Sequence, residues 1–232
     1  MTTADKVMQN NQLIERTMVL GLHEHLLTSL PQEVTYNTPI LDIGCGTGAW
    51  LERLANAGFT HLQGIDRDTE QFATQKATCS PADLDFGDIG LAEKKFGLIT
   101  SIEVIEHIEN PGRLFYHVAN LLESNGYFLL TTPNLHSVLC KIRFLLTGKL
   151  RQFDDKGEPT HIYPIFLTPL MRILQRYNLE IVKKWSYPIA GSVTSRASLK
   201  IASSLLSSIL RDELPGDILC LLIKKNKTNL AK

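Results

Sequence analysis

The sequence predicts an α/β fold in which helices cover both faces of a doubly wound, largely parallel sheet. Two observations carry this prediction. Short apolar runs bounded by glycine alternate with segments of helical spacing, the pattern of parallel strands joined by helices. The run from Ile40 to Ile43 leads directly into a loop that contains Gly44, Gly46 and Gly48, and a helical segment follows. A strand, a glycine loop and a helix in this order form the first nucleoside-binding turn of such a sheet.

The periodicity of the apolar residues predicts the order of the elements. Strands are expected near residues 39–43, 61–66, 83–86, 97–102, 126–132, 179–186 and 217–224, and helices near 48–57, 69–78, 111–123 and 168–177. An N-terminal helical region at 1–34 is expected to cover the ligand cleft with one side of a helix, which carries Leu13, Ile14, Thr17, Met18, Gly21, Leu22 and His25. We expect the chain to form a single domain over 1–232.

Composition restricts the classes of function. The 232 residues carry 24 basic and 24 acidic side chains, so the formal net charge is zero. A protein that binds nucleic acid through a broad basic field needs an excess of positive charge, and this class is therefore excluded. The four cysteines form no Cys-x-x-Cys pair, which indicates reduced thiols in a cytoplasmic protein rather than a zinc framework.

The residue that precedes the glycines separates two classes of ligand. Asp42 lies two positions before Gly44, where it would repel a pyrophosphate held on the following helix N-terminus. A donor with a cationic end and no phosphate has the opposite preference, and S-adenosylmethionine carries an ammonium and a sulfonium. The stretch from Leu41 to Gly48 resembles the first motif of class I S-adenosylmethionine-dependent methyltransferases. The looser Gly-x-Gly-x-x-Ala pattern of dinucleotide enzymes also fits, so both ligands stay open at this point.

The resemblance implies a Rossmann-like, seven-stranded sheet whose last strand is antiparallel, and it implies a set of donor contacts. The glycine loop would supply Asp42, Gly44, Cys45, Gly46 and Gly48. Asp66, which ends the next strand and is followed by Arg67, is the expected ribose ligand because a carboxylate accepts two hydroxyl hydrogen bonds. Asp88 and Ile89 resemble the segment that reads the adenine edge, with the acidic side chain of Asp88 as the reader.

The chemistry is expected just after the strand at 97–102. If the chain turns helically there, Glu103, Glu106 and His107 share one face. Their Glu-x-x-Glu-His pattern resembles the ubiquinone-biosynthesis O-methyltransferases and the small-RNA 2′-O-methyltransferases. That resemblance implies a divalent ion, either magnesium, manganese or zinc, held by these three residues and His161 beside the acceptor hydroxyl. Without a metal, Glu106 would bind backbone amides and His107 would line the cleft as a general base.

An insertion at 135–165 begins with an amphipathic segment. Apolar residues recur at helical spacing between Leu135 and Leu146. Positive charge comes from Lys141, Arg143, Lys149 and Arg151. Such a helix either covers the substrate pocket as a lid or makes a peripheral contact with a membrane. The apolar, serine-rich region at 190–214 is expected to form a further cap, a dimer face or a second membrane contact.

These expectations combine into one functional prediction. The chain is expected to be a cytoplasmic methyltransferase that uses S-adenosylmethionine and methylates an oxygen of a small-molecule or lipid-linked acceptor. Two alternatives remain open. One is a non-catalytic S-adenosylmethionine-binding subunit of a partner enzyme, which the intact Glu103, Glu106 and His107 pattern disfavours. The other is an NAD-dependent oxidoreductase.

Overall fold

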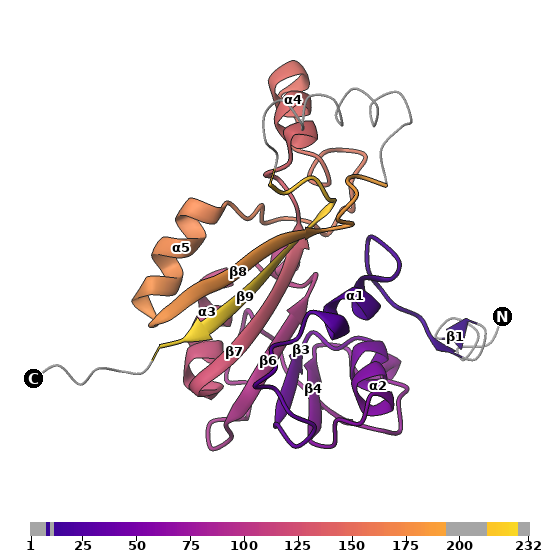
Figure 1. Cartoon of the computed structure of the whole chain (residues 1–232), viewed down its shortest axis with the longest axis vertical. Helices are drawn as coiled ribbons and strands as arrows, with labels where there is room; N and C mark the ends of the chain where they lie inside the picture. Colours follow the sequence, from indigo (N-terminus) through magenta and orange to yellow (C-terminus); the bar gives the residue numbers. More distant parts are fainter. Residues whose placement is uncertain (1–7, 10–11, 194–212, 227–232) are drawn as a thin grey trace, which may run out of the picture.

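The computed structural model describes residues 8–9, 12–193 and 213–226. The strands of its main sheet are β3 (Ile40–Ile43), β4 (Leu62–Asp66), β5 (Thr78–Pro81), β6 (Phe96–Ile102), β7 (Leu122–Pro133), β8 (Leu179–Tyr187) and β9 (Ile218–Lys225). They form a seven-stranded sheet in the order β5-β4-β3-β6-β7-β9-β8 (Figure 1). Neighbours from β5 to β7 are parallel, and β9 runs antiparallel to both β7 and β8. The predicted doubly wound sheet with an antiparallel last strand is therefore confirmed.

Helices connect and cover these strands. They are α1 (Leu22–Thr28), α2 (Ala49–Asn56), α3 (Pro111–Leu121), α4 (Val138–Thr147) and α5 (Leu167–Arg176), with 3-10 turns η2 (Thr69–Gln71) and η3 (Ile105–His107). A two-stranded ribbon of β1 (Met8–Gln9) and β2 (Gln12–Leu13) precedes them. No helix within the described part of the chain is long and apolar enough to span a membrane.

Two apolar layers hold the helices on opposite faces of the sheet. Ile40 and Leu41 are neighbours on β3, and successive strand residues point to opposite faces. Ile40 packs in a cluster with residues of α1 and α2, whereas Leu41 packs with residues of α3 and α5. Each of these fully buried side chains contributes about 1.5–3 kcal/mol to folding. The pattern of the sequence therefore fixes which face of β3 each helix covers.

The carboxyl ends of β3, β4 and β6 meet at one edge of the sheet. Asp42 on β3 is in register with Gly64 on β4 and with Thr100 on β6. The glycine loop, the end of β4 and the turn after β6 consequently lie side by side. Open parallel sheets bind their ligands at this edge, so the fold brings the candidate site residues of three separate motifs together.

The predicted N-terminal helix is only partly present. Helix α1 begins at Leu22, after Gly21 with a φ of 82°, and residues 13–20 form an extended segment that we call the strap. Side chains bind backbone groups of the strap: the Thr17 hydroxyl donates to the Val19 carbonyl, and the Thr47 hydroxyl donates to the Ile14 carbonyl. Such bonds compete with helical hydrogen bonding, so the apolar spacing alone predicted too long a helix.

The segment after β4 also differs from the prediction. The helix expected at 69–78 is reduced to η2, capped by Asp68, whose side chain accepts from the Glu70 backbone amide. The chain then becomes extended and forms β5 at Thr78–Pro81, several residues before the expected strand at 83–86. Pairing with β4 explains the shift, because Cys79 lies in register with Gly64. Of the predicted cap region at 190–214, residues 194–212 lie outside the described part of the chain.

Candidate active site

The glycine loop between β3 and α2 has a backbone that side chains would obstruct. Gly44 has a φ of 76°, and a Cβ atom there would lie 2.4 Å from Cγ2 of Val104. Gly48, with a φ of 83°, precedes α2, and a Cβ atom at this position would clash with the side chains of Phe72 and Thr74. Gly46 also has a positive φ, of 51°, but nothing lies within 4 Å of its missing Cβ. The loop therefore leaves open space at Gly46, as a ligand that approaches the main chain requires.

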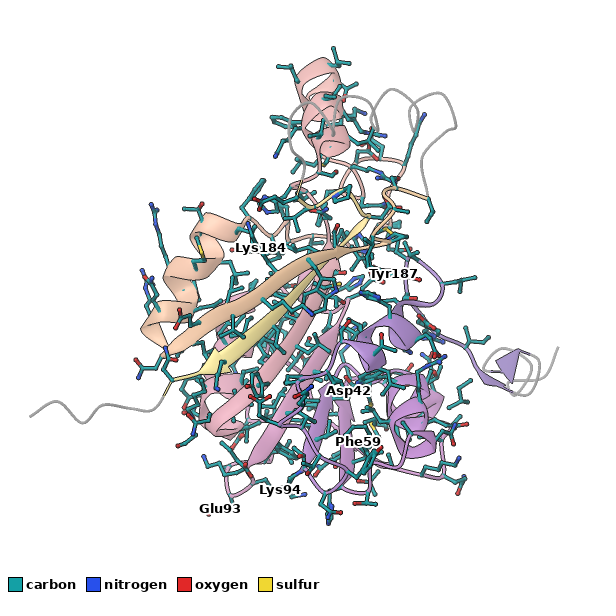
Figure 2. All side chains as sticks on the ribbon, in the orientation of Figure 1. Asp42, Phe59, Glu93, Lys94, Lys184 and Tyr187 are labelled. Carbon is teal, nitrogen blue, oxygen red and sulfur yellow. The ribbon has the colours of Figure 1, made fainter. Side chains whose placement is uncertain are left out.

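Asp42 is buried at the start of this loop (Figure 2). Its carboxylate accepts a hydrogen bond of 2.6 Å from the Thr100 hydroxyl, which in turn accepts from Nε1 of Trp50. Burial raises the pKa of Asp42 to about 7. These contacts tie β3 to β6 directly beneath the loop. A direct contact of Asp42 with a donor stays a prediction.

Cys45 has its side chain directed into the sheet. The thiol lies 3.3 Å from the thiol of Cys79, and a Cβ on Gly64 would come within 2.5 Å of it. Burial raises the pKa of Cys45, so the thiol is unreactive. A contact between Cys45 and a donor would therefore use its backbone.

Asp66 lies where β4 ends, and its side chain organises the neighbouring turns. One carboxylate oxygen accepts from the Gly46 amide at 2.8 Å, and the other accepts from the Asp68 amide at 2.9 Å. Asp66 also lines two adjoining clefts. An acceptor group at the edge of the glycine loop is the geometry that a ribose hydroxyl pair requires.

The smaller cleft has a volume of about 260 Å³ and runs from β4 to the turn after β6. Its lining includes the predicted donor contact Arg67 together with Asp83 and Leu84. Asp88 does not line it; this residue lines a separate surface pocket beside α3, and Ile89 is buried in the core. The adenine-reading role expected of Asp88 and Ile89 stays a prediction, although neither residue lines this cleft. Because β5 ends early, at Pro81, Asp83 and Leu84 line the smaller cleft.

The larger cleft has a volume of about 860 Å³ and opens beside Gly46 and Asp66. The strap forms one wall and the loop at 152–161 forms another. Thr17 and Met18 on the strap were expected to cover the cleft, and they do line it, although the strap is not a helix. No motif or periodicity marks the other lining residues, which are Arg16 on the strap and Gln152, Lys156, Glu158 and Thr160 on the loop. The helix expected to act as a lid, α4, supplies none of these residues.

The sequence predicts that Glu103, Glu106 and His107 share one helical face. In the structure, Glu103 does not lie on that face. The residue has a φ of 53°, and its amide donates to the backbone carbonyl and the hydroxyl of Thr131. This conformation turns the Glu103 carboxylate toward the strap, where it accepts from the Met18 amide at 2.6 Å. Burial raises the pKa of Glu103 to about 7. Glu103 therefore fastens the strap over the cleft.

Glu106, His107 and His161 come together, with the two histidines at the larger cleft and Glu106 buried behind them. Each offers one ligand atom, and these atoms lie within 4.8 Å of one another. The backbone explains the meeting, because the Glu106 carbonyl accepts from the amides of Ile162 and Tyr163 and so holds the loop against η3. Within the described residues, this is the group whose spacing could accommodate a metal ion. Glu103 is not part of it.

Hydrogen bonds to backbone carbonyls orient the two histidine rings of this group. Nδ1 of His107 lies 3.1 Å from the Thr160 carbonyl, and Nδ1 of His161 lies 3.0 Å from the Gln152 carbonyl. Because a carbonyl only accepts, both Nδ1 atoms carry protons and both Nε2 atoms are left as acceptors or ligands. Burial, together with His161, lowers the pKa of His107 and keeps that ring neutral.

Glu106 completes the group from within the core. Both of its carboxylate oxygens are buried, and neither makes a hydrogen bond of good geometry among the described residues, although the Thr132 side chain and the Glu106 backbone amide lie close enough to lower its pKa somewhat. Burial, together with the nearby Glu103, raises the pKa of Glu106 well above its usual value. A buried carboxyl without a partner either stays protonated or binds a cation, since the free anion is strongly disfavoured.

Comparison with known proteins shows which family the chain resembles. A family model described as a methyltransferase domain matches residues 18–184. The ubiquinone biosynthesis O-methyltransferase of Neisseria meningitidis serogroup C is 28% identical over 153 residues, which are 61% of this chain and 63% of that protein. The protein of the same name from Bartonella quintana is 28% identical over 178 residues, 73% of this chain and 70% of that one. The chain thus spans less than two thirds of the length of the first of these relatives.

Solved structures agree with the observed fold. An S-adenosylmethionine-dependent methyltransferase from Archaeoglobus fulgidus superposes with a TM-score of 0.60 at 20% identity, covering 88% of this chain and 94% of that one. The magnesium protoporphyrin IX methyltransferase from Synechocystis, solved with bound S-adenosylhomocysteine, gives a TM-score of 0.56 at 14% identity, covering 88% and 82%. At these identities the likeness establishes a shared fold.

Proposed function

We propose that this chain, which belongs to the methyltransferase domain family, transfers a methyl group from S-adenosylmethionine to an oxygen atom of its acceptor. The observation that carries the proposal is the larger cleft, in which Gly46 and Asp66 face the same opening as His107 and His161. A donor held on the glycine loop presents its methyl group toward the two histidines. Methyl transfer is an in-line displacement, so alignment of donor and acceptor supplies most of the catalysis.

Charge in the cleft supports this donor. The S-adenosylmethionine carboxylate needs a cationic partner, and Arg16 on the strap lies at the same opening as Gly46. Asp66 accepts from the ribose hydroxyls, and Asp83 with Leu84 reads the adenine edge in the smaller cleft. These roles divide the donor between the two adjoining clefts.

We further propose that Glu106, His107 and His161 hold a divalent cation beside the acceptor. When bound, the ion lowers the pKa of the acceptor hydroxyl and so supplies the nucleophile near neutral pH. The chain contributes two imidazoles, each with Nδ1 held by a backbone carbonyl, and a carboxylate that the ion keeps ionised. Two nitrogen ligands and one oxygen ligand suit magnesium poorly and manganese or zinc well.

The outer end of α4 favours a lipid-linked acceptor. This helix projects from the body of the molecule (Figure 1), and its side chains at Phe144, Leu145 and Leu146 are 51%, 83% and 77% exposed. The expected positive charge is largely neutralised, because Arg143, Lys149 and Arg151 pair with Asp154, Asp155 and Asp217. We therefore propose that apolar contact, rather than attraction to anionic lipids, brings α4 to a bilayer.

The test of this proposal uses S-adenosylmethionine labelled in its methyl group and vesicles made from a total lipid extract. Label is expected to enter the lipid fraction through a base-stable ether bond. A variant with Phe144, Leu145 and Leu146 all changed to Ser is expected to label that fraction at least about tenfold less, since each apolar side chain adds about 1.5–3 kcal/mol of burial. Its affinity for S-adenosylhomocysteine should match that of the wild type.

Tyr116→Ser, which removes an exposed aromatic ring from α3, is the matched control and should label lipid normally. Label confined to the aqueous fraction would show a soluble acceptor. Equal labelling of lipid by the triple variant and the wild type would show that α4 does not bring the protein to the bilayer.

A further inference from the structure

The strap is fastened to the rest of the molecule mainly through side chains. Thr47, beside the glycine loop, donates to the Ile14 carbonyl, and Glu103 accepts from the Met18 amide. The Tyr187 hydroxyl on β8 donates to the Leu20 carbonyl. Between these points lie Arg16, Thr17 and Met18, the residues that form one wall of the larger cleft.

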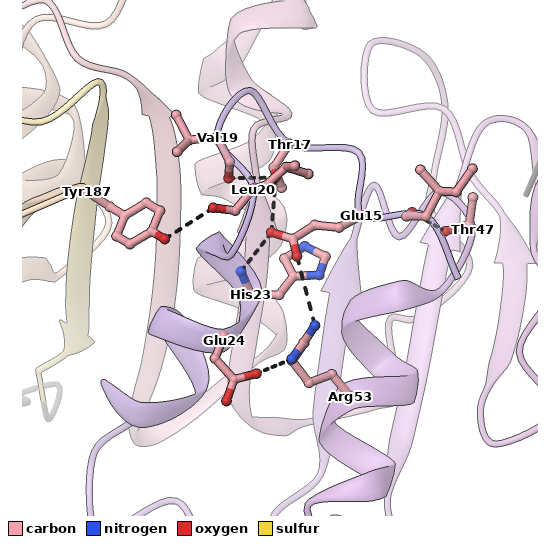
Figure 3. Close-up of polar contacts among 10 residues, drawn as sticks. Glu15, Thr17, Val19, Leu20, His23, Glu24, Thr47, Arg53 and Tyr187 are labelled. Atoms are coloured by element: carbon pink, nitrogen blue, oxygen red, sulfur yellow. Dashed lines mark hydrogen bonds and ion pairs between the residues drawn. The ribbon is translucent and has the colours of Figure 1, made fainter. Parts of the chain in front are cut away.

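Glu15 is the centre of this fastening (Figure 3). Its Oε1 accepts from the His23 amide at 3.0 Å, and it shares the single proton of the Thr17 hydroxyl with the Val19 carbonyl, each acceptor lying 3.0 Å from that hydroxyl. One carboxylate oxygen thus bridges the strap and the first turn of α1. The side chain is only 12% exposed, so both hydrogen bonds are shielded from water.

The ion pair of Glu15 is the weaker of its contacts. Its Oε2 lies 3.9 Å from Nη2 of Arg53, whereas Glu24 binds Nη1 of the same guanidinium directly. Arg53 therefore already has a carboxylate partner on α1. The particular contribution of Glu15 is its hydrogen bonds to the strap, because no other acidic residue in this group makes them (Figure 3).

We infer that Glu15 is a positioning residue for the donor site. By holding Thr17 and the start of α1 on one oxygen, it sets the path of the strap and so the placement of Arg16 and Met18 against the glycine loop. The Glu15 carboxylate does not line the larger cleft, so it has no direct contact with the donor in this proposal. It borders a separate pocket between α1 and α2. The inference rests on the proposed use of S-adenosylmethionine.

Met18 is held to Glu103 by its backbone amide, so rotation of the strap at Glu15 moves that amide away from its acceptor. Small displacements of a wall that holds a substrate have large effects, since a shift of about 1 Å in a positioning element can lower the rate by about a hundredfold. Loss of Glu15 is therefore expected to weaken the donor site although it lies outside the cleft.

The test measures S-adenosylhomocysteine affinity by calorimetry on the full chain. Glu15→Ala is expected to raise the dissociation constant by about tenfold to a hundredfold. Glu15→Gln keeps an oxygen that accepts from Thr17 and His23, and it should remain within about threefold of the wild type. Glu24→Ala, the matched control, removes the closer carboxylate of Arg53 without touching the strap and should bind normally.

A merely structural role would give a different pattern. If Glu15 only neutralised Arg53, Glu15→Gln and Glu24→Ala would weaken binding as much as Glu15→Ala, and the inference would be overturned. Equal affinity of Glu15→Ala and wild type would overturn it as well. Should Glu15→Ala not fold, Glu15→Asp keeps the charge but withdraws the oxygen, and it should bind several-fold more weakly. A wild-type chain that does not bind S-adenosylhomocysteine would instead contradict the proposed function.

Discussion

Changing Asp66 to Ala is expected to raise the dissociation constant for S-adenosylhomocysteine by about fivefold to more than a hundredfold. The carboxylate is the acceptor that ends β4, and it also holds the Gly46 and Asp68 amides. Its removal takes away the partner of the ribose hydroxyls and leaves the loop amides unbound. Stranding such groups in a buried site costs about 1–3 kcal/mol.

Calorimetric titration with S-adenosylhomocysteine measures this loss directly. Asp68→Ala is the matched control, because Asp68 lies two residues away, accepts from Glu70 and lines neither cleft. Unchanged affinity in Asp66→Ala would remove the ribose role. Equal losses in both variants would show that the turn after β4, rather than the Asp66 carboxylate, is what the donor requires.

Changing Glu106 to Gln is expected to abolish the stabilisation of the protein by Mn²⁺. A ligand at a hundred times its dissociation constant stabilises the folded state by about 2.7 kcal/mol. For a chain of this size that corresponds to a rise in melting temperature of roughly 5–10 °C. Gln keeps the shape of the buried side chain but cannot supply an anionic oxygen, so the variant should fold and show no rise.

Thermal unfolding with and without Mn²⁺ gives the measurement, and Glu103→Gln gives the control. Glu103 is buried on the same turn but points to the Met18 amide, so its variant should keep the full Mn²⁺ response. If the two variants exchange behaviour, the ligand set contains Glu103 instead. A wild type that Mn²⁺ does not stabilise would leave His107 as a base without a metal.

Much of the fold could be predicted because its signals are local. Strands β3, β4, β6, β7, β8 and β9 lie within one or a few residues of the expected ranges. Their apolar runs are buried in the parallel sheet, where periodicity and glycine boundaries are strongest. The glycine loop was predictable from a local signal as well. Its glycines are required because a Cβ atom at Gly44 or Gly48 would clash with Val104 or Phe72.

The parts that could not be predicted depend on contacts between distant segments. The strap has apolar residues at helical spacing, yet Thr47 and Glu103 bind its backbone and Glu15 ties it to α1 in a conformation that is not helical. The shift of β5 follows from its register on β4, and it places Asp83 rather than Asp88 in the smaller cleft. Glu103 left the expected helical face because β6 continues to Ile102 and the next residue turns to a positive φ.

The most direct test of the central claim is a pair of titrations of the wild-type chain, one with S-adenosylhomocysteine and one with NADH. We predict saturable binding of S-adenosylhomocysteine at one site per chain and no heat from NADH, because Asp42 lies beside the glycine loop where a pyrophosphate would lie. Saturable binding of NADH without binding of S-adenosylhomocysteine would contradict it.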